Sequence, residues 1–405
     1  MRVLLVHNYY CIRGGEDVVL EQELEILRAA GVDVRLFSVR NSEMRGLRAK
    51  MIAGLSTIYN PWARRKLAAE IAAFAPDVVH VHNFFPQLSP SIFDACRRAG
   101  VPSVMTLHNL RIADPRACYE MTVPDPDKPR RSPWAMVPQR VYRGSFCATL
   151  ALVAMVEFHR WRGTWLTRVD RFIALSNSAK AMLVARGLPA SKIVVKPNSV
   201  LKAERPPSQT ARHGALFVGR LDEQKGVKTL LQAWKDIDYP LTIIGDGPLA
   251  DLVAAAQNSK ISFLGLQSRA NVENAMRSSQ LLVFPSLAHE MFPMTIAEAF
   301  ANQLPVLASA IPSLRDVVSD VETGLLFSTG DAASLAQCVT RAVRSVPELE
   351  ALSRNAYKKY LESYTPEANA AALIRLYSSL AGAAQCGTDA QLRHAGQDDG
   401  LERAS

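Results

Sequence analysis

Short apolar runs alternate along the chain with longer stretches in which apolar residues recur every three or four positions. The short runs are rich in branched side chains and predict buried strands, whereas the longer stretches predict helices. This alternation is typical of parallel sheets covered by helices. The predicted strands are residues 3–6, 32–37, 78–81, 103–107, 171–175 and 193–196 in the first half, and 215–218, 241–244, 261–263, 281–284 and 305–308 in the second. The clearest helices are predicted at 18–30, 178–185 and 227–234.

A polar segment with paired prolines, residues 202–212, interrupts the alternation and predicts a linker. A chain of 405 residues exceeds one ordinary core. We therefore expect an α/β protein with two doubly wound, Rossmann-like domains that face each other across a cleft. They comprise residues 1–201 and 213–382, and the last helices of the second domain can pack back on the first. From residue 383 the chain is polar and rich in small residues, which predicts a disordered tail to residue 405.

Composition narrows the class of protein. Apolar residues make up 48% of the chain and charged residues 21%, as in globular proteins. The chain begins with a strand pattern where a signal peptide would carry a charged and then an apolar region. The six cysteines form no Cys-x-x-Cys pair, so we expect a protein of the reducing cytoplasm without disulfides or zinc. The net charge of +9 suits phosphate-bearing ligands, but no nucleic-acid-binding motif accompanies it, so no nucleic-acid partner is expected.

Two acidic residues follow the strand predicted at 281–284. Glu290 lies in the loop after that strand, and Glu298 lies about one turn into the next helix, whose first turn suits Pro293. The carboxyl end of a strand and the amino end of the next helix form the usual ligand crevice of an α/β sheet. Two acids in such a crevice can hold sugar hydroxyls. The alternative is a helix with a surface acid.

The loop after the strand predicted at 215–218 carries Arg220 and Lys225. Their spacing can bring two cations onto one diphosphate, although two solvated charges flanking a turn would give the same pattern. Gly245 and Gly247 end the strand predicted at 241–244. They lack the third glycine of a dinucleotide fingerprint, which argues against a dehydrogenase, and we interpret them as mainly conformational.

In the first half, Gly14 and Gly15 precede the helix predicted at 18–30. Glycines before a helix start expose N–H groups to an anion, and the helix dipole adds partial positive charge. Glu16 and Asp17 follow directly, and both also favour the helix start by capping and by the dipole.

Three histidines end or line neighbouring strands. His108 follows the strand predicted at 103–107, where an imidazole could donate a hydrogen bond to a sugar hydroxyl or stabilise charge. His80 and His82 face one side of the strand predicted at 78–81 and have the spacing of a metal pair. No third ligand stands near them in the sequence, which favours lining of the cleft over metal binding.

Residues 140–165 contain a stretch that is apolar almost all round, with four arginines beside it: Arg140, Arg143, Arg160 and Arg162. The stretch is too short to span a membrane. One interpretation is a helix buried in the first domain. The other is an interfacial helix on the cytoplasmic leaflet, with the arginines on lipid phosphates.

The segment that contains the two acids resembles glycosyltransferase family 4, whose members are retaining transferases of the GT-B fold. Glu290, Phe292, Pro293 and Glu298 match the Glu-x7-Glu pattern of that family. The resemblance implies that Glu290 is catalytic and contacts the donor sugar, and that Glu298 binds the ribose. The implied loop around the donor sugar and phosphate consists of Phe292, Pro293, Met294 and Thr295.

The resemblance implies further roles on both sides of the cleft. The donor diphosphate would be bound by Arg220, Lys225, Gly14 and Gly15. His108 would be a second catalytic residue beside the reacting centre, and the loops with Gly245, Gly247 and Leu264 would lie beside the nucleotide. Because arginine and lysine take the place of a metal in this family, no metal or other cofactor is expected. The Asp-x-Asp patterns at 125–127 and 236–238 are interpreted as chance.

The chain departs from the family pattern at two places. Asn302 and Gln303 occupy the turn where a glycine usually ends the helix, and we expect Asn302 to provide the left-handed cap. Met291 stands where close relatives often have glycine, and it is expected to crowd the sugar subsite.

We therefore expect transfer of a sugar from a UDP- or GDP-linked donor to a hydroxyl acceptor with retention, in cell-surface polysaccharide or glycolipid synthesis. The expected acceptor is a saccharide or lipid-linked saccharide bound mainly by the first domain. The expected location is the cytoplasm, with residues 140–165 as the contact if the protein binds the inner membrane peripherally. The alternatives are a sugar-nucleotide epimerase of the same fold and a nucleotide-sugar-binding protein without catalysis.

Overall fold

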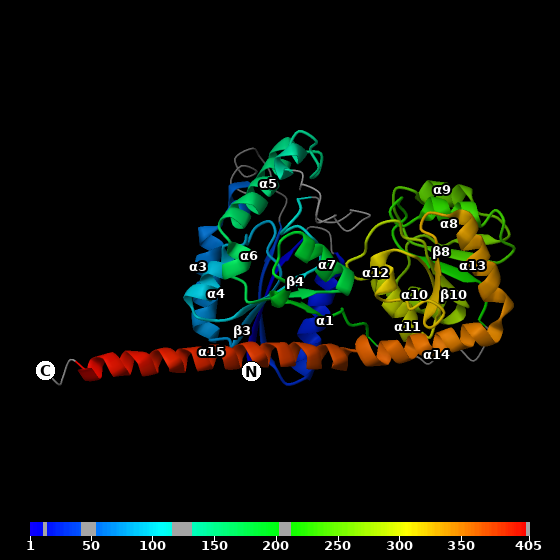
Figure 1. Ribbon diagram of the computed structural model, residues 1–405. Coiled ribbons are helices and arrows are strands. Elements are labelled where there is room, and N and C mark those ends of the chain that lie inside the picture. Colours follow the sequence, from blue (N-terminus) through cyan, green and yellow to red (C-terminus); the bar gives the residue numbers. More distant parts are fainter. Residues whose placement is uncertain (11–13, 42–53, 116–131, 202–211, 402–405) are drawn as a thin grey trace.

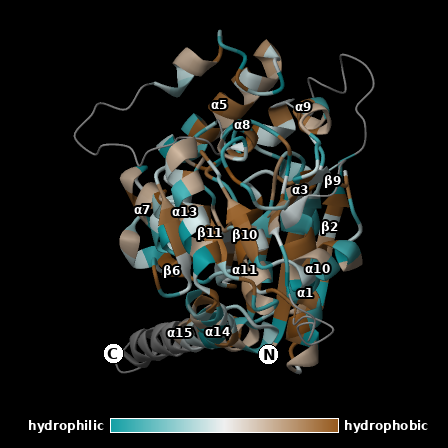
Figure 2. Ribbon diagram, turned by 90° about the vertical axis from the view of Figure 1, so that its right-hand side faces the viewer, coloured by the Kyte–Doolittle hydropathy of each residue, from teal (hydrophilic) through white to brown (hydrophobic). Residues whose placement is uncertain are grey.

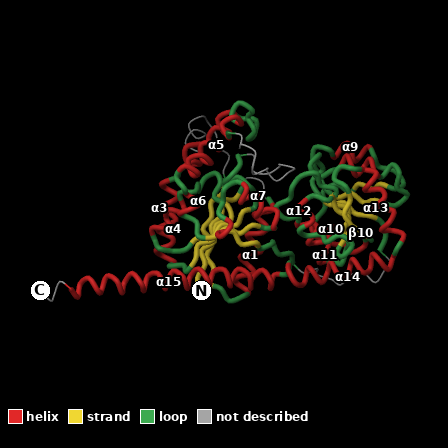
Figure 3. The backbone as a smooth tube through the Cα atoms, in the orientation of Figure 1, coloured by secondary structure: helices red, strands yellow, loops and turns green. Residues whose placement is uncertain are grey.

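Two parallel sheets, each surrounded by helices, form the two lobes of the protein (Figures 1 and 3). The computed structural model describes residues 1–10, 14–41, 54–115, 132–201 and 212–401, with side chains described up to residue 383. The predicted linker lies outside these ranges except for Arg212, and so does the Asp-x-Asp pattern at 125–127.

The N-terminal sheet has the strand order β2-β1-β3-β4-β5-β6, and every pairing is parallel. Its strands are β1 (Arg2–Tyr9), β2 (Asp33–Arg40), β3 (Val78–Asn83), β4 (Ser103–Leu107), β5 (Arg171–Ala174) and β6 (Ile193–Val195). The helices of this lobe are α1 (Gly15–Ala29), α3 (Pro61–Phe74), α4 (Ile92–Arg98), α5 (Phe146–Trp161), α6 (Thr164–Thr167) and α7 (Asn177–Ala185), with short 3₁₀ helices η1 (Pro133–Met136) and η2 (Ala190–Lys192).

The C-terminal sheet has the order β12-β11-β10-β7-β8-β9 and is also parallel. Its strands are β7 (Ala215–Val218), β8 (Leu241–Ile244), β9 (Ile261–Phe263), β10 (Leu281–Phe284), β11 (Val306–Ser309) and β12 (Gly324–Phe327). Its helices are α8 (Val227–Ala233), α9 (Ala250–Ala255), α10 (Arg269–Ser278), α11 (Met294–Ala301), α12 (Pro312–Arg315) and α13 (Ala332–Arg344).

Each sheet reverses its strand order once, between β1 and β3 in the first lobe and between β7 and β10 in the second. Ligands of open parallel sheets bind outside the carboxyl ends of the strands at such a reversal. The strands of both sheets are buried. In Figure 2, where one lobe lies in front of the other, brown strands occupy the middle of the molecule. This order fixes which loops meet, because the loops after β7 and β10 leave neighbouring strand ends.

The predicted strands are all present, and the structure adds β12, which the sequence analysis did not predict. This strand begins with Gly324, a residue that is depleted in strands and that masks the pattern. Glycine is needed there because a Cβ atom would lie 2.2 Å from the carbonyl oxygen of Val306 on the neighbouring strand.

Helices α14 (Val346–Ser363) and α15 (Pro366–Leu401) run across both lobes (Figure 1). The backbone N–H of Val200 donates to the carbonyl of Tyr364 at 2.8 Å, and the hydroxyl of Tyr377 lies 2.6 Å from Nδ1 of His80 on β3. The expectation that the last helices pack on the first domain is thus confirmed. A direct bond between lobes joins the N–H of Ser178 on α7 to Oδ2 of Asp316 at 2.7 Å.

The predicted disordered tail differs from the structure, in which α15 continues through residue 383 to Leu401. The segment holds several alanines, and alanine has the highest intrinsic helix propensity, which favours continuation of a helix that is already nucleated. Residues 402–405 lie outside the described residues.

Candidate functional site

The loops after β7 and β10 meet at the reversal point of the C-terminal sheet. The N–H of Leu287 donates to the carbonyl of Gln224 at 2.7 Å, which ties one loop to the other. Gly226 has a positive φ of 72°, and a Cβ atom there would lie 1.9 Å from the carbonyl oxygen of Pro285. Only glycine allows this approach, so Gly226 determines how closely Lys225 comes to the loop after β10.

The approach places Lys225 against Glu290. Nζ of Lys225 lies 2.6 Å from Oε1 of Glu290, and both side chains are partly exposed. The hydroxyl of Ser286 donates to the same carboxylate oxygen at 2.9 Å, and the N–H of Glu290 donates to Oγ of Ser313 at 3.0 Å. The sequence analysis did not single out these two serines, because serine is common in loops and only the fold brings them to Glu290.

Arg220 lies in the same loop as Lys225. Its Nε lies 3.2 Å from Oδ2 of Asp222, whose Oδ1 accepts a hydrogen bond from the N–H of Lys225 at 2.9 Å. The Arg220 side chain is 69% exposed, so much of the guanidinium can still meet a ligand. Asp222 therefore orders both cations without burying them.

Helix α11 presents Glu298 one turn from its start, as predicted. Pro293, in contrast, precedes the helix as its N-cap, and its carbonyl accepts from the N–H of Ile296 at 3.0 Å. Burial raises the pKa of the Glu298 carboxyl, while Arg269 at the start of α10 opposes this shift. Glu298 is partly buried, so its carboxyl has lost some of its water, and a ligand hydroxyl can replace that water.

The turn after α11 is left-handed as expected, but at Gln303 (φ 52°), whereas Asn302 keeps a negative φ. The N–H of Leu304 donates to Ala299 at 2.8 Å and that of Gln303 to Phe300 at 3.0 Å, which is the Schellman pattern of helix ends. Arg212 completes the turn by donating to the carbonyls of Asn302 and Gln303 at 2.7 and 2.6 Å. This side chain offsets the cost of a non-glycine residue.

The loop after β8 is held by backbone contacts. A Cβ atom on Gly245 would lie 1.9 Å from the carbonyl oxygen of Gly219, and one on Gly247 would lie 2.6 Å from that of Leu221. Both glycines therefore have the conformational role predicted for them. Leu264, in the loop after β9, is 47% exposed beside them.

In the N-terminal lobe, Gly14 is the N-cap of α1 and Gly15 its first residue. A Cβ atom on either glycine would meet no described atom within 4 Å, and residues 11–13, which precede the helix, lie outside the described residues. Asp17 is buried and caps the helix, since Oδ2 accepts from the N–H of Gly14 at 2.8 Å and Oδ1 lies 2.7 Å from Nε2 of His7.

Glu16 lies beside a buried polar group. Its carboxylate accepts from Nδ2 of Asn83 at 2.9 Å. Burial raises the pKa of Glu16 to about 7, although the charge of Arg111 lowers it. Arg111 itself donates to the hydroxyl of Tyr10 at 2.7 Å and lies over the ring of Phe85 at 4.5 Å from its centroid.

His108 borders a small pocket at the carboxyl ends of β3 and β4. The pocket is lined by His82, Asn83, Phe84, Phe85, Met105, Thr106, Leu107, His108, Asn109, Arg111 and Ile112. Burial, followed by the neighbouring His82, lowers the pKa of His108 well below its ordinary value. The imidazole is therefore neutral at pH 7 and offers one donor and one acceptor nitrogen.

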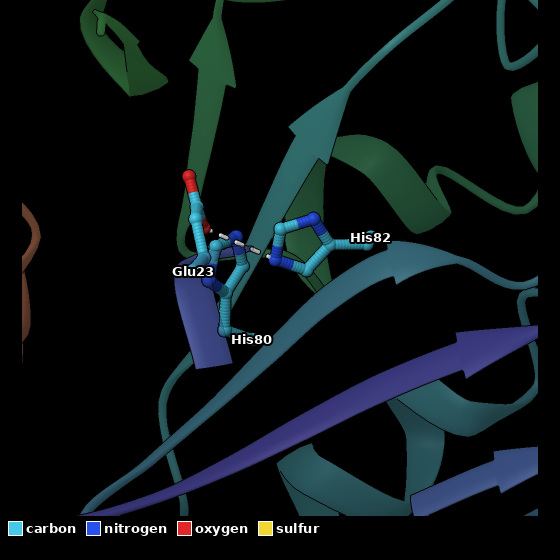
Figure 4. Close-up of side chains that lie close together, drawn as sticks. All are labelled: Glu23, His80 and His82. Atoms are coloured by element: carbon cyan, nitrogen blue, oxygen red, sulfur yellow. Dashed lines mark ion pairs between the residues drawn. The ribbon is translucent and has the colours of Figure 1, made fainter. Parts of the chain in front are cut away.

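The sequence left two interpretations for His80 and His82 of β3, metal binding and lining of the cleft. The structure places these two histidines in different surroundings. His82 lines the pocket, whereas His80 is enclosed between the Tyr377 hydroxyl at 2.6 Å and Oγ1 of Thr106 at 2.8 Å. Glu23 of α1 is the third potential ligand, and the ligand atoms of Glu23, His80 and His82 lie within 4.8 Å of one another (Figure 4). The Lys196 ammonium already lies 2.6 Å from Glu23, so the cluster is closed by protein partners.

Met291 contacts the apolar cores of both lobes. The next residue, Phe292, packs its ring against Tyr364 with centroids 5.5 Å apart. The loop after β10 thus lies between the lobes. Whether Met291 crowds a sugar stays a prediction.

Helix α5 has a buried face and an exposed apolar face, so neither sequence interpretation describes all of it. Leu152, Val153 and Met155 are fully buried, whereas Phe146 is 49% and Leu150 39% exposed. Trp134 of η1, which packs against α5, is 48% exposed. We call the following group the α5 surface: Trp134, Arg140, Arg143, Phe146 and Leu150, the two arginines also being exposed.

The described Asp-x-Asp pattern lies away from these loops. Asp236 and Asp238 are exposed in the segment before β8, at the amino end of the sheet, and Asp238 lies 3.0 Å from Lys260. Their position supports the interpretation as chance.

Contacts among the described residues thus assemble two groups. Lys225, Glu290 and Arg220 form one on the C-terminal lobe, while His108 and His82 belong to the other on the N-terminal lobe. No hydrogen bond or ion pair within the described part of the chain joins the two groups directly.

Two family models match the chain. One described as Glycosyltransferase Family 4 matches residues 13–201, and one described as Glycosyl transferases group 1 matches residues 203–359. A phosphatidyl-myo-inositol mannosyltransferase of Mycobacterium leprae is 27% identical over 371 residues, which are 85% of this chain and 88% of the relative. A GDP-mannose-dependent alpha-mannosyltransferase of Mycolicibacterium smegmatis is 28% identical over 295 residues, which are 69% of this chain and 68% of the relative.

Solved structures share the arrangement of both lobes. A sucrose-phosphate synthase from Thermosynechococcus elongatus superposes with a TM-score of 0.69 at 20% identity, covering 94% of this chain and 99% of the other. HepE of Anabaena, solved in complex with UDP, has a TM-score of 0.64 at 15% identity, covering 94% of this chain and 100% of HepE. No helix in the described ranges has both the length and the apolar character needed to span a bilayer.

Proposed function

Because this chain belongs to glycosyltransferase family 4 and has the GT-B fold, we propose that it transfers a hexose from a UDP- or GDP-linked donor to a hydroxyl acceptor with retention at the anomeric carbon. The observation that carries the proposal is the Lys225–Glu290 contact at the reversal point of the C-terminal sheet. This contact holds the Lys225 ammonium, which suits the leaving diphosphate, beside the Glu290 carboxylate, which suits the donor sugar.

Each charged group has a role in this reaction. Arg220 and Lys225 neutralise the charge that develops on the leaving diphosphate, an effect worth several kcal/mol in a closed site. The diphosphate also approaches the start of α1, where a Cβ atom on Gly14 or Gly15 would meet no described atom within 4 Å. Arginine, lysine and N–H groups supply the positive charge, so the proposed reaction needs no metal.

Glu290 orients the donor sugar. Its carboxylate is bound by Lys225 and Ser286. The arriving diphosphate competes for Lys225, which turns the Glu290 oxygens toward the sugar hydroxyls. Glu298 accepts from the ribose hydroxyls, and the leaving phosphate takes the acceptor proton on the same face of the sugar.

The acceptor is proposed to bind against the N-terminal lobe with its reacting hydroxyl near His108, since the pocket beside this residue is too small to enclose a sugar. The name of the mycobacterial relative supports a glycolipid acceptor, and a saccharide remains the alternative. A lipid-linked acceptor also suits peripheral binding to the cytoplasmic face of the membrane. We assign this contact to the α5 surface, in which exposed arginines stand beside exposed aromatic and aliphatic side chains.

Thermal-shift measurements with UDP, GDP and their sugars test the donor, with GDP-mannose and UDP-glucose as the first candidates. A rise in melting temperature with one base only assigns the donor class, and a transfer assay with a synthetic lipid-linked saccharide then tests catalysis. An epimerase would convert the donor without any acceptor. A binding protein would be stabilised by the nucleotide sugar yet release no nucleoside diphosphate.

A further inference from the structure

Four groups from four separate elements, three of them buried, form a row that ends at the partly exposed His108. The Lys196 ammonium, which follows β6, lies 2.6 Å from Oε1 of Glu23 on α1. Oε2 of Glu23 lies 3.3 Å from Nε2 of His82 on β3, and Nδ1 of His82 lies 3.2 Å from Nε2 of His108. Glu23, His82 and Lys196 are at most 4% exposed. None of these three residues has a role in the proposed reaction.

The charge of Glu23 determines where the protons lie. Burial by itself raises the pKa of Glu23, but the Lys196 ammonium and His82 outweigh it and hold that pKa well below its ordinary value. Glu23 is therefore a carboxylate, which can only accept hydrogen bonds. Oε2 of Glu23 and Nε2 of His82 are both buried, and neither atom makes a hydrogen bond within the described residues, so their 3.3 Å contact is of the ion-pair type. A proton on Nε2 of His82 turns this contact into an attraction, whereas a lone pair there would face the carboxylate.

The requirement that a donor faces an acceptor also applies to the contact between His82 and His108. A neutral His82 with its proton on Nε2 has a lone pair on Nδ1, so Nδ1 accepts. Nε2 of His108 must then donate across the 3.2 Å contact. A neutral imidazole carries one proton, which leaves a lone pair on Nδ1 of His108.

We propose that Glu23 and His82 are positioning residues that hold His108 in the tautomer with its proton on Nε2, so that Nδ1 accepts a hydrogen bond from a substrate hydroxyl. This reverses the donor role expected from the sequence. The identity of the hydroxyl rests on the proposed function, whereas the tautomer rests only on the contacts among these side chains.

The other groups around the row are occupied by different partners. Both nitrogens of His80 are used by Tyr377 and Thr106. Nε2 of His7 lies against Asp17 at 2.7 Å. Burial, with the nearby His82 and His7, lowers the pKa of His108. Neither His80 nor His7 makes a hydrogen bond to the ring nitrogens of His108 within the described residues.

Nitrogen-15 NMR of the full chain, labelled on histidine, reads the tautomer directly. The His108 signals are assigned by their loss in His108→Gln. We expect a bare Nδ1 and a protonated Nε2 in the unliganded protein at pH 7.5. A proton on Nδ1 of His108 would overturn the proposal, and this reading needs neither donor nor acceptor.

Variants then separate positioning from structure. In His82→Leu the tautomers of His108 should mix, and kcat for transfer should fall between about tenfold and about a hundredfold with little change in the KM for the donor, as for other outer-shell partners of histidine. Tyr377→Phe is the matched control, because it removes a buried hydrogen bond from the adjacent His80 and should leave the His108 signals unchanged. An unaltered His108 spectrum in a folded His82→Leu variant would contradict the assignment.

If the predicted tautomer is seen in a protein that transfers no sugar, the proposed function fails and the tautomer assignment stands.

Discussion

Nζ of Lys225 lies 2.6 Å from Oε1 of Glu290, and the two residues are 65 positions apart in the chain. They meet because β7 and β10 are neighbours in the sheet and because Gly226 lets the two loops touch. The pair is only partly buried, so its net contribution to stability is small. Its position at the reversal point of the sheet is better explained by ligand binding than by folding.

Replacement of Glu290 should separate binding from transfer. In Glu290→Ala we expect kcat to fall by about 10²- to 10³-fold, the cost of losing one oriented polar group in an active site, while affinity for the nucleoside diphosphate stays within about threefold. Transfer assays and calorimetric titration with the nucleotide measure both. Glu223→Ala is the control, since Glu223 is an exposed acid two residues from Lys225. Turnover equal to the unmodified protein would remove Glu290 from the mechanism.

Replacement of two glycines should affect different properties of the protein: stability at Gly226 and ligand affinity at Gly14. Gly226→Ala introduces a Cβ atom 1.9 Å from a carbonyl oxygen at positive φ, and we expect the free energy of unfolding to fall by about 1–3 kcal/mol. In Gly14→Ala the Cβ atom meets no described atom within 4 Å, so stability should fall only by the cost of alanine at an N-cap, about 1 kcal/mol or less, while the affinity for the diphosphate falls. Urea denaturation and nucleotide titration distinguish the two. Equal loss of stability in both variants would contradict this difference between Gly14 and Gly226.

The stability of the protein should decrease in mild acid because it buries neutral histidines. Burial lowers the pKa of His159 from 6.5 to about 4, although a hydrogen bond to the carbonyl of Ile58 opposes the shift. Between pH 6.5 and about pH 4, His159 therefore binds a proton in the unfolded chain but not in the folded protein. Its contribution to stability is fully present above pH 6.5 and is lost as the pH falls to about 4.

His159→Gln isolates this contribution, since other groups titrate alike in both proteins. The difference in free energy of unfolding between the unmodified protein and the variant should shrink by up to about 3 kcal/mol between pH 7 and pH 4. Urea denaturation at several pH values measures it. A difference that stays constant over this range would show that His159 is not buried in its neutral form.

Binding of the α5 surface to membranes is tested with vesicles. Phe146→Ser with Leu150→Ser should weaken sedimentation with vesicles that contain anionic phospholipid by at least about tenfold, because apolar area and arginine charge act together. Binding should also weaken at high salt, since exposed charges are screened. Val194→Ser, an equally exposed apolar position on β6, is the control. Equal binding of both variants would place the contact elsewhere.

Much of the fold could be predicted from the sequence because strands and turns are encoded locally. The apolar runs located every strand except β12, whose glycine start hides the pattern. The loop positions of Arg220, Lys225 and Glu290 followed from the strand ends that precede them. The helix start at Pro293 and the left-handed residue at Gln303 were each misplaced by one position, because helix ends depend on capping contacts such as that of Arg212.

Only the tertiary structure decided which of these residues act together. The Lys225–Glu290 contact, the serines that hold Glu290, and the row from Lys196 to His108 join residues from separate elements. The proton position on His108 depends on Glu23, a residue that looks like any acid on an amphipathic helix until α1 packs against β3. Local pattern thus determines where polar groups leave the sheet, whereas hydrogen bonding between distant segments determines their charge, their tautomer and their partners.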